Sequence, residues 1–202
     1  SQMIKTLALA AGLALSTGAA QAKVTFDPVT SSVVISGATT SWQVNSVYEV
    51  FKDNEVLTVV LSGNGGEFYS GLSLGRLIAE EGSAVVIPEG TTCVSSCAFA
   101  ALAGERVIVK GELWFHPPYL QAIPTNVTTI EVAQMFGRAY VDMARYLIEM
   151  GIPVTFGHDL LVRSDPWNFV VIDDGLQIDR LKSTEVPWGP AIYEYRYNKL
   201  GE

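Results

Sequence analysis

The sequence has few positive charges, few histidines and few cysteines, and each shortage excludes a class of function. Lysine and arginine number 13 against 21 acidic residues, a net charge of −8, so we expect neither a nucleic-acid surface nor binding to an anionic membrane. The only histidines, His116 and His158, lie far along the chain from the two cysteines, which argues against a metal site. The phosphate-binding patterns GxxxxGK(S/T) and GxGxxG are also absent. We therefore predict no metal and no other cofactor.

Long hydrophobic runs are scarce after the first twenty residues. Lys5 precedes an apolar run at 6–20, and a small-x-small site, Ala-Gln-Ala, follows at 20–22. This order is typical of a secretory signal peptide, and the run is shorter than the roughly 20 apolar residues that a membrane anchor needs. We interpret 1–22 as a two-residue remnant before the start methionine plus a signal peptide. The mature chain, 23–202, is expected to be periplasmic or secreted, without a stable membrane anchor.

The remainder of the chain has the composition and pattern of one α/β domain. Apolar residues make up 49% of the sequence, enough for a sizeable core. Short apolar strands alternate with amphipathic helices, which favours right-handed crossovers and a mainly parallel sheet. Strands are expected at 33–35, 56–61, 84–87, 106–109, 113–115 and 169–172, helices at 41–52, 69–81, 128–150 and 156–163, and an added C-terminal strand after residue 187.

The longest expected helix begins at a capping box, Thr-Thr-Ile-Glu at 128–131. Gly151 and Pro153 follow it and predict its end. Its apolar residues recur at helical spacing and predict a buried stripe. The residues of that stripe are Val132, Phe136, Ala139, Met143 and Leu147.

The stretch 91–104 joins a short strand to an alanine-rich helix, and Ser95 and Ser96 lie between Cys93 and Cys97. A small polar residue at such a turn is either a helix cap or an exposed nucleophile beside unpaired amides. Taken alone, the stretch favours the cap. The cysteines of an exported chain could form a disulfide, because positions four apart on a helix have Cα atoms roughly 6 Å apart. Two small buried thiols are the alternative.

Two other segments have residues suited to acyl transfer. The glycine-rich segment 62–66 follows a buried strand and predicts either half of an oxyanion hole or a simple turn. His116 ends a hydrophobic strand beside a loop, where a histidine could activate a serine, whereas His158 is expected at the surface. The spacing does not choose among the downstream carboxylates that could orient the base. Those carboxylates are Asp159, Asp165, Asp173 and Asp174.

Three stretches resemble the Clp protease proteolytic subunit (ClpP) family, within the wider ClpP/crotonase fold. The segment 61–66 resembles the family's Asn-Ser-Pro-Gly-Gly loop, 93–99 resembles its Ala-Ala-Ser-Met-Gly-Ala-Phe segment, and 106–117 resembles the segment that ends Met-Ile-His-Gln-Pro. The order of elements is similar over 33–176, and the chain looks closest to small exported bacterial ClpP-like proteins. The resemblance implies a spiral of repeated ββα units with a mainly parallel sheet and flanking helices.

Carried over position by position, the resemblance implies a catalytic site. Ser95 matches the nucleophile, because the Ala-Phe and Ala-Gly that follow then fall in register. His116 matches the general base. The amides that match the oxyanion hole belong to Gly65, Gly66 and Ser96.

The resemblance also implies a catalytic acid, and the sequence differs from the family pattern at three places. Asp165 matches the acid, because it lies at nearly the family's distance before a Gly-Leu pair, and Asp159 is the second choice. Asn64 replaces the family proline, the connection at 104–106 is shorter, and Pro118 stands beside the histidine. The features that dock an ATPase are not recognisable.

The leading hypothesis is an exported serine peptidase-like hydrolase that cleaves peptides or proteins without an ATPase partner. The alternative is an inactive module that binds peptides or a protein partner, favoured if the acid geometry is missing or if a disulfide twists the Ser95 turn. A crotonase-type acyl-thioester enzyme ranks last, because an exported protein rarely meets coenzyme A. The resemblance also implies self-association into a homo-oligomer.

Overall fold

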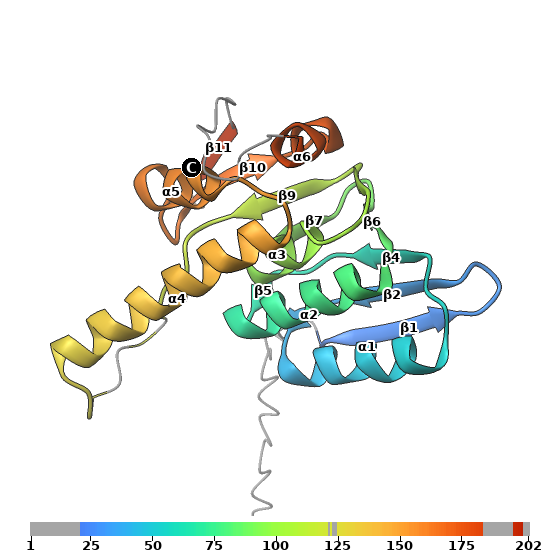
Figure 1. Cartoon of the computed structure of the whole chain (residues 1–202), viewed down its shortest axis with the longest axis horizontal. Helices are drawn as coiled ribbons and strands as arrows, with labels where there is room; N and C mark the ends of the chain where they lie inside the picture. Colours follow the sequence, from blue (N-terminus) through green and yellow to red (C-terminus); the bar gives the residue numbers. More distant parts are fainter. Residues whose placement is uncertain (1–20, 121, 123–124, 184–195, 200–202) are drawn as a thin grey trace, which may run out of the picture.

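The computed structural model describes residues 21–120, 122, 125–183 and 196–199 (Figure 1). Four successive units of two strands and a helix form most of it, which confirms the predicted ββα repeat. The units are β2 (Ser32–Ser36), β3 (Ala38–Thr39) and α1 (Ser41–Asp53); β4 (Thr58–Leu61), β5 (Gly65–Gly66) and α2 (Phe68–Glu81); β6 (Ala84–Ile87), β7 (Thr92–Val94) and α3 (Ser96–Ala101); and β8 (Val107–Val109), β9 (Glu112–Phe115) and α4 (Thr129–Glu149). The remaining elements are β1 (Lys23–Asp27), α5 (Val154–Arg163), β10 (Asn168–Ile172), α6 (Gly175–Lys182) and β11 (Arg196–Lys199).

The strand pairs are mainly parallel, as predicted, and the antiparallel pairs involve β1, β10 and β11. The first strands of the four units form a parallel ladder, β2-β4-β6-β8, with β1 antiparallel to β2 at one edge. The second strands pair as β3 with β5 and β7 with β9, both parallel. Antiparallel β10 and β11 extend the sheet from β9. The second strands of successive units therefore lie in two smaller sheets, apart from the ladder of first strands.

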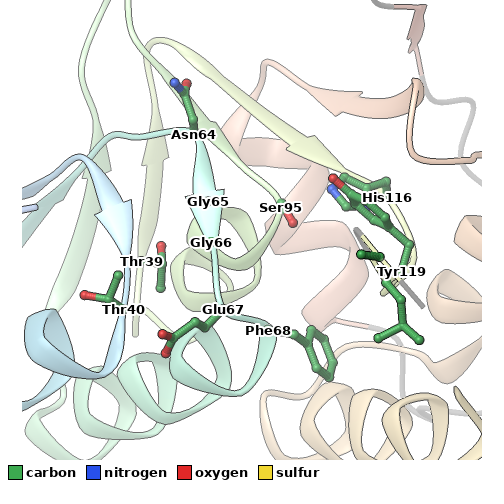
Figure 2. Close-up of a pocket in the computed structure, with 12 residues that line it drawn as sticks. Thr39, Thr40, Asn64, Gly65, Gly66, Glu67, Phe68, Ser95, His116 and Tyr119 are labelled. Carbon is green, nitrogen blue, oxygen red and sulfur yellow. The ribbon is translucent and has the colours of Figure 1, made fainter. Parts of the chain in front are cut away.

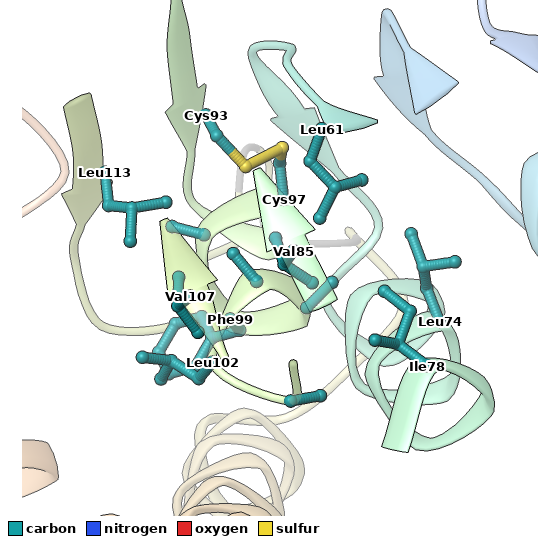
Figure 3. Close-up of a cluster of buried hydrophobic side chains, with 14 of the residues drawn as sticks. Leu61, Leu74, Ile78, Val85, Cys93, Cys97, Phe99, Leu102, Val107 and Leu113 are labelled. Carbon is teal, nitrogen blue, oxygen red and sulfur yellow. A yellow bond between two sulfur atoms is a disulfide. The ribbon is translucent and has the colours of Figure 1, made fainter. Parts of the chain in front are cut away.

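Helix α3 lies at the centre of the core, and every one of its residues is buried. Figure 3 shows side chains from β4, β6, β8 and β9 meeting those of α2 and α3 around Phe99. Burial of one large apolar side chain stabilises a fold by about 1.5–3 kcal/mol, so this cluster anchors α3 firmly. The turn that precedes α3 is consequently fixed in space.

Local chemistry explains where the strongest elements begin and end. Helix α2 stops at Gly82, which adopts φ 72° and donates its N–H to the carbonyls of Ile78 and Ala79, a left-handed stop that glycine favours. Helix α4 begins with both bonds of the predicted capping box between Thr128 and Glu131. The boundaries of these helices lie within one residue of the predicted ones.

The predicted buried stripe of α4 is wrong over its first half. Met143 and Leu147 are buried, together with Tyr146, but Val132, Phe136 and Ala139 are only partly buried. The physical reason is that the first turns of α4 extend away from the body of the molecule (Figure 1), so only its C-terminal turns reach the core.

Other expectations fall on short elements or outside the described residues. Five elements are absent from the sequence prediction, namely β1, β3, β5, β7 and α6. Helix α6 begins after Asp174, its N-cap, where the sequence predicts only a turn. The predicted signal segment lies outside the described residues apart from positions 21 and 22, and β11 is the part of the predicted C-terminal strand that is described. Among the described helices none is both long enough and apolar enough to cross a membrane.

Candidate active site

A cavity of about 610 Å³ brings Ser95, His116 and the Gly65–Gly66 strand together (Figure 2). Its lining is polar beside β3 and β5, where Thr39 and Glu67 contribute oxygen atoms. The rest of the lining includes apolar and aromatic side chains from the start of α2 and from the segment after His116. Such a concave site with a few converging polar groups is the usual form of a substrate pocket.

Ser95 does not act as the helix cap that its stretch alone favours. It occupies the N-cap position of α3, but its side chain makes no capping hydrogen bond. Its backbone is at φ 57° and ψ −122°, a conformation that costs a non-glycine residue about 1–3 kcal/mol and is concentrated at functional turns. The N–H of Ser95 donates to the carbonyl of Trp114 at 2.8 Å, and its carbonyl accepts from Phe99 at 3.0 Å. The hydroxyl is left on the side of the cavity where His116 lies (Figure 2).

A disulfide closes the turn around Ser95. Cys93 at the middle of β7 and Cys97 in α3 are bonded, with Cα atoms 5.3 Å apart, and both are almost fully buried. Figure 3 shows the bond inside the core cluster. The bond joins a strand to a helix, so the separation differs from the helical spacing assumed from the sequence. Of the two alternatives left open by the sequence, the structure has the disulfide.

Gly65 is pressed against the candidate nucleophile. A Cβ atom at this position would lie 2.8 Å from the Cβ of Ser95 and 2.6 Å from the carbonyl oxygen of Val94. Its φ of 81° is also in the left-handed region that only glycine adopts readily. Both the space and the backbone conformation therefore require glycine here.

The amides of Gly66 and Ser96 are placed to receive an anion. Glu67 donates its N–H to the carbonyl of Thr39 on β3 at 2.9 Å. Because successive amides of an extended strand point in opposite directions, the N–H of Gly66 points away from β3, toward the side of β5 on which Ser95 lies (Figure 2). Ser96 is the first residue of α3, so its N–H has no partner within the helix. Strand alternation thus makes Gly66, rather than Gly65, the glycine whose amide we expect on the side of the site.

His116 is buried, with 6% of its surface exposed, directly after β9. Its Nδ1 atom lies 2.8 Å from the carbonyl oxygen of Pro117. A carbonyl oxygen can only accept, so Nδ1 carries the hydrogen and Nε2 of the neutral ring carries the lone pair. Burial lowers the pKa of His116, and the hydrogen bond to Pro117 opposes that shift more weakly. The ring is thus a neutral base at pH 7, with an acceptor nitrogen for a serine proton.

Asp165 and Asp159, the first and second choices for the acid, each have one carboxylate oxygen near another group. Asp165 is exposed, and its Oδ1 accepts the N–H of Trp167 at 2.8 Å. Asp159 has its Oδ1 3.8 Å from Nε of Arg163. Within the described ranges, neither carboxylate has a hydrogen bond or ion pair with His116.

An aromatic ring from β10 occupies the place beside the base. The register that pairs Val170 with Phe115 puts Phe169 opposite His116, and the two ring centroids are 5.2 Å apart. Tyr119 contacts the same imidazole ring, at 5.1 Å between centroids. His158 is exposed on α5, as predicted. Sequence reasoning missed the groups that contact His116, because they depend on strand register and on the conformation of the segment after the histidine.

Comparisons with known proteins give a partial likeness among solved structures. No protein-family model matches the chain, and no curated protein matches it. Among solved structures, the chain is similar to a mutant of ClpP1 from Listeria monocytogenes, with 18% sequence identity and a TM-score of 0.48. The matched region covers 61% of this chain and 73% of that chain. A match of this extent assigns neither a family nor an activity to the protein.

Proposed function

We propose that the protein is a serine hydrolase that cleaves an acyl bond, in a peptide or protein substrate, with Ser95 as nucleophile and His116 as general base. The observation that carries the proposal is the placement of Ser95. It is held in a strained backbone conformation without capping α3, and it lines the same cavity as a histidine whose Nε2 is an acceptor.

The proposed reaction follows from these positions. The Oγ atom of Ser95 forms a bond to the substrate's carbonyl carbon while its proton moves to Nε2 of His116. The carbonyl oxygen becomes an oxyanion, which the amides of Gly66 and Ser96 stabilise, each by about 3–4 kcal/mol in comparable enzymes. His116 then gives the proton to the leaving amine as the carbon–nitrogen bond breaks. Water, deprotonated by the same nitrogen, releases the acyl group and restores Ser95.

Export and self-association belong to the same proposal. The signal-like segment and the disulfide suit an oxidising compartment outside the cytoplasm, where no ATP-driven unfoldase is available. Helix α4 presents Ile130, Met135 and Val141, which are 71%, 41% and 58% exposed. Apolar residues gathered on one exposed helix favour contact with another subunit, so we expect a homo-oligomer.

A second candidate function is a peptide-binding module without catalysis. The observation that favours it is the lack of a carboxylate partner for His116 in the described part of the chain. Both candidates use the same cavity, and they differ in whether Ser95 reacts.

A fluorophosphonate probe separates the two candidates, because it forms a covalent bond only with an activated serine. We expect the purified protein to be labelled at Ser95 between about pH 6 and pH 9. This range extends upward from the ordinary histidine pKa of about 6.5, above which a histidine base is neutral. Ser95→Ala should abolish labelling, whereas Ser46→Ala, which removes a half-buried serine of α1 that donates to the carbonyl of Trp42, should leave it intact. Absence of labelling over this pH range would contradict the hydrolase and support the binding module.

A further inference from the structure

The groups around the imidazole of His116 indicate how this base is positioned. This inference rests on the proposed function. In a serine–histidine–aspartate site a carboxylate accepts the hydrogen of Nδ1, which fixes the tautomer and stabilises the imidazolium ion. Here that hydrogen is donated to the carbonyl oxygen of Pro117, 2.8 Å away. The position that a catalytic acid would occupy is therefore already filled by the backbone.

Two consecutive prolines hold this carbonyl in place. The pyrrolidine ring of Pro117 fixes its own φ near −65°. Because Pro118 follows, the backbone of Pro117 is also restricted to extended conformations. The carbonyl thus points in one direction without a contribution from a distant side chain.

Among the described residues, the other contacts of the ring are with aromatic side chains and not with carboxylates. From β10 the contact is Phe169, and from the segment after His116 it is Tyr119. The Asp165 carboxylate accepts the N–H of Trp167, two residues along the chain, so this hydrogen bond lies within the turn of Asp165 itself. On α5, Asp159 is next to Arg163. Glu67, across the cavity, accepts from the N–H of Ser41 and the hydroxyl of Ser70.

We propose that the site works as a serine–histidine pair in which the carbonyl of Pro117, and no carboxylate, positions His116. Pro117 is a positioning residue: it fixes the tautomer and the ring orientation, so that Nε2 is left as the acceptor in the cavity that Ser95 also lines. The proton taken from Ser95 stays on Nε2 until it passes to the leaving group, and the hydrogen on Nδ1 stays with the Pro117 carbonyl throughout. The carbonyl has no net charge, so it stabilises the imidazolium ion less than an aspartate would.

The first test replaces Asp165 by asparagine, which keeps an oxygen to accept the Trp167 N–H. A functional triad loses about 10⁴-fold in rate when its aspartate becomes asparagine, whereas the proposed pair predicts a labelling rate for Asp165→Asn within about threefold of the parent. Asp159→Asn should behave alike. A fall of about 100-fold or more in either folded variant would overturn the inference, with folding checked by circular dichroism. If the parent protein is not labelled at all, the proposed function fails instead, so the two failures are distinguishable.

The second test does not depend on activity. His158 is exposed on α5, so its replacement by glutamine should not disturb the fold. The variant His158→Gln keeps His116 as the only histidine of the sequence, and ¹H–¹⁵N NMR then reports on that ring alone. Its spectrum should show hydrogen on Nδ1, and its pKa should lie below the ordinary histidine value of about 6.5, because the ring is buried and no carboxylate of the described residues acts on it. Adding Asp165→Asn should not move that titration. A pKa above the ordinary value, or one that drops on Asp165→Asn, would show that a carboxylate acts on the ring and would overturn the inference.

Discussion

The two halves of the candidate site are held in different ways. The Ser95 half is fixed by a disulfide, by close glycine packing and by a helix whose residues are all buried. The His116 half depends on one hydrogen bond to the next residue and on two ring contacts. Beyond it the chain continues into α4, whose first half is largely exposed. The nucleophile is therefore positioned by the core, and the base by Pro117 and Tyr119, which follow it in the chain, and by Phe169 of β10.

This difference has a consequence for chemistry. A strained nucleophile needs surroundings that hold it, because its conformation costs about 1–3 kcal/mol, and α3 supplies them. A neutral imidazole needs only a fixed tautomer and a fixed orientation, for which a single carbonyl is sufficient. The two halves share one backbone hydrogen bond, from the Ser95 N–H to the carbonyl of Trp114. Variants that affect one half at a time can test whether the halves are otherwise independent.

The largest expected effect is on the Ser95 half, from Gly65→Ala. A residue with a side chain loses about 1–2 kcal/mol in the left-handed region, and here the new Cβ would also lie 2.8 Å from that of Ser95. We expect fluorophosphonate labelling to fall by about 100-fold, the scale of losing one oxyanion donor. The measurement is the labelling rate, together with the unfolding midpoint.

Gly82→Ala is the matched control for that variant. Gly82 has a similar φ of 72°, but nothing lies within 4 Å of the position that a Cβ would take. It should lose a similar backbone contribution to stability while its labelling rate remains that of the parent. Equal labelling rates for the two variants would show that the contact between Gly65 and Ser95 is unimportant.

The contrast between the halves also explains what could be predicted from the sequence. Helix α2 and strand β6 were predicted to within one residue, because apolar spacing and a glycine stop are local signals. The strand formed by Gly65 and Gly66 was not, since glycine has low strand propensity and only pairing with β3 makes it a strand. In the site, motif order put Ser95 and His116 in one place. The partner of Nδ1 could not be predicted, because it depends on how the chain turns after the histidine.

Removal of the disulfide should have the next largest effect. The sequence predicts this bond only as one of two alternatives. Closing a loop of about five residues stabilises a fold by about 2 kcal/mol in the chain-entropy treatment. For a chain of this size we expect the double variant Cys93→Ala with Cys97→Ala to melt about 4–8 °C lower. Labelling should fall by about tenfold, because the strained Ser95 turn would lose its covalent closure.

Reduction with dithiothreitol gives the control for the double variant. The parent should shift toward the variant's melting temperature and labelling rate, and the variant itself should not respond. A reduced parent that keeps both its melting temperature and its labelling rate would show that α3 and the glycine contacts hold Ser95 without the disulfide.

The smallest expected effect concerns the anchoring of α4 to the Ser95 half. Arg76 on α2 has its Nε 2.7 Å from a carboxylate oxygen of Glu149, and its guanidinium lies 5.6 Å from the centre of the Tyr146 ring. An exposed ion pair contributes about 0.2–1 kcal/mol, and a cation–π contact at such a site about 0.5–1 kcal/mol. Glu149→Gln removes only the ion pair, so it should lower the melting temperature less than Arg76→Gln does.

Salt separates the two contributions further, because at about 1 M ionic strength the screening length falls to about 3 Å. The Glu149→Gln shift should then nearly vanish, while part of the Arg76→Gln shift remains. Labelling should be unchanged in both variants, since the buried Met143, Tyr146 and Leu147 still hold α4 against the core. A labelling rate that falls by about tenfold or more with Arg76→Gln would mean that the placement of α4 controls the site, and the two halves would then be coupled rather than independent.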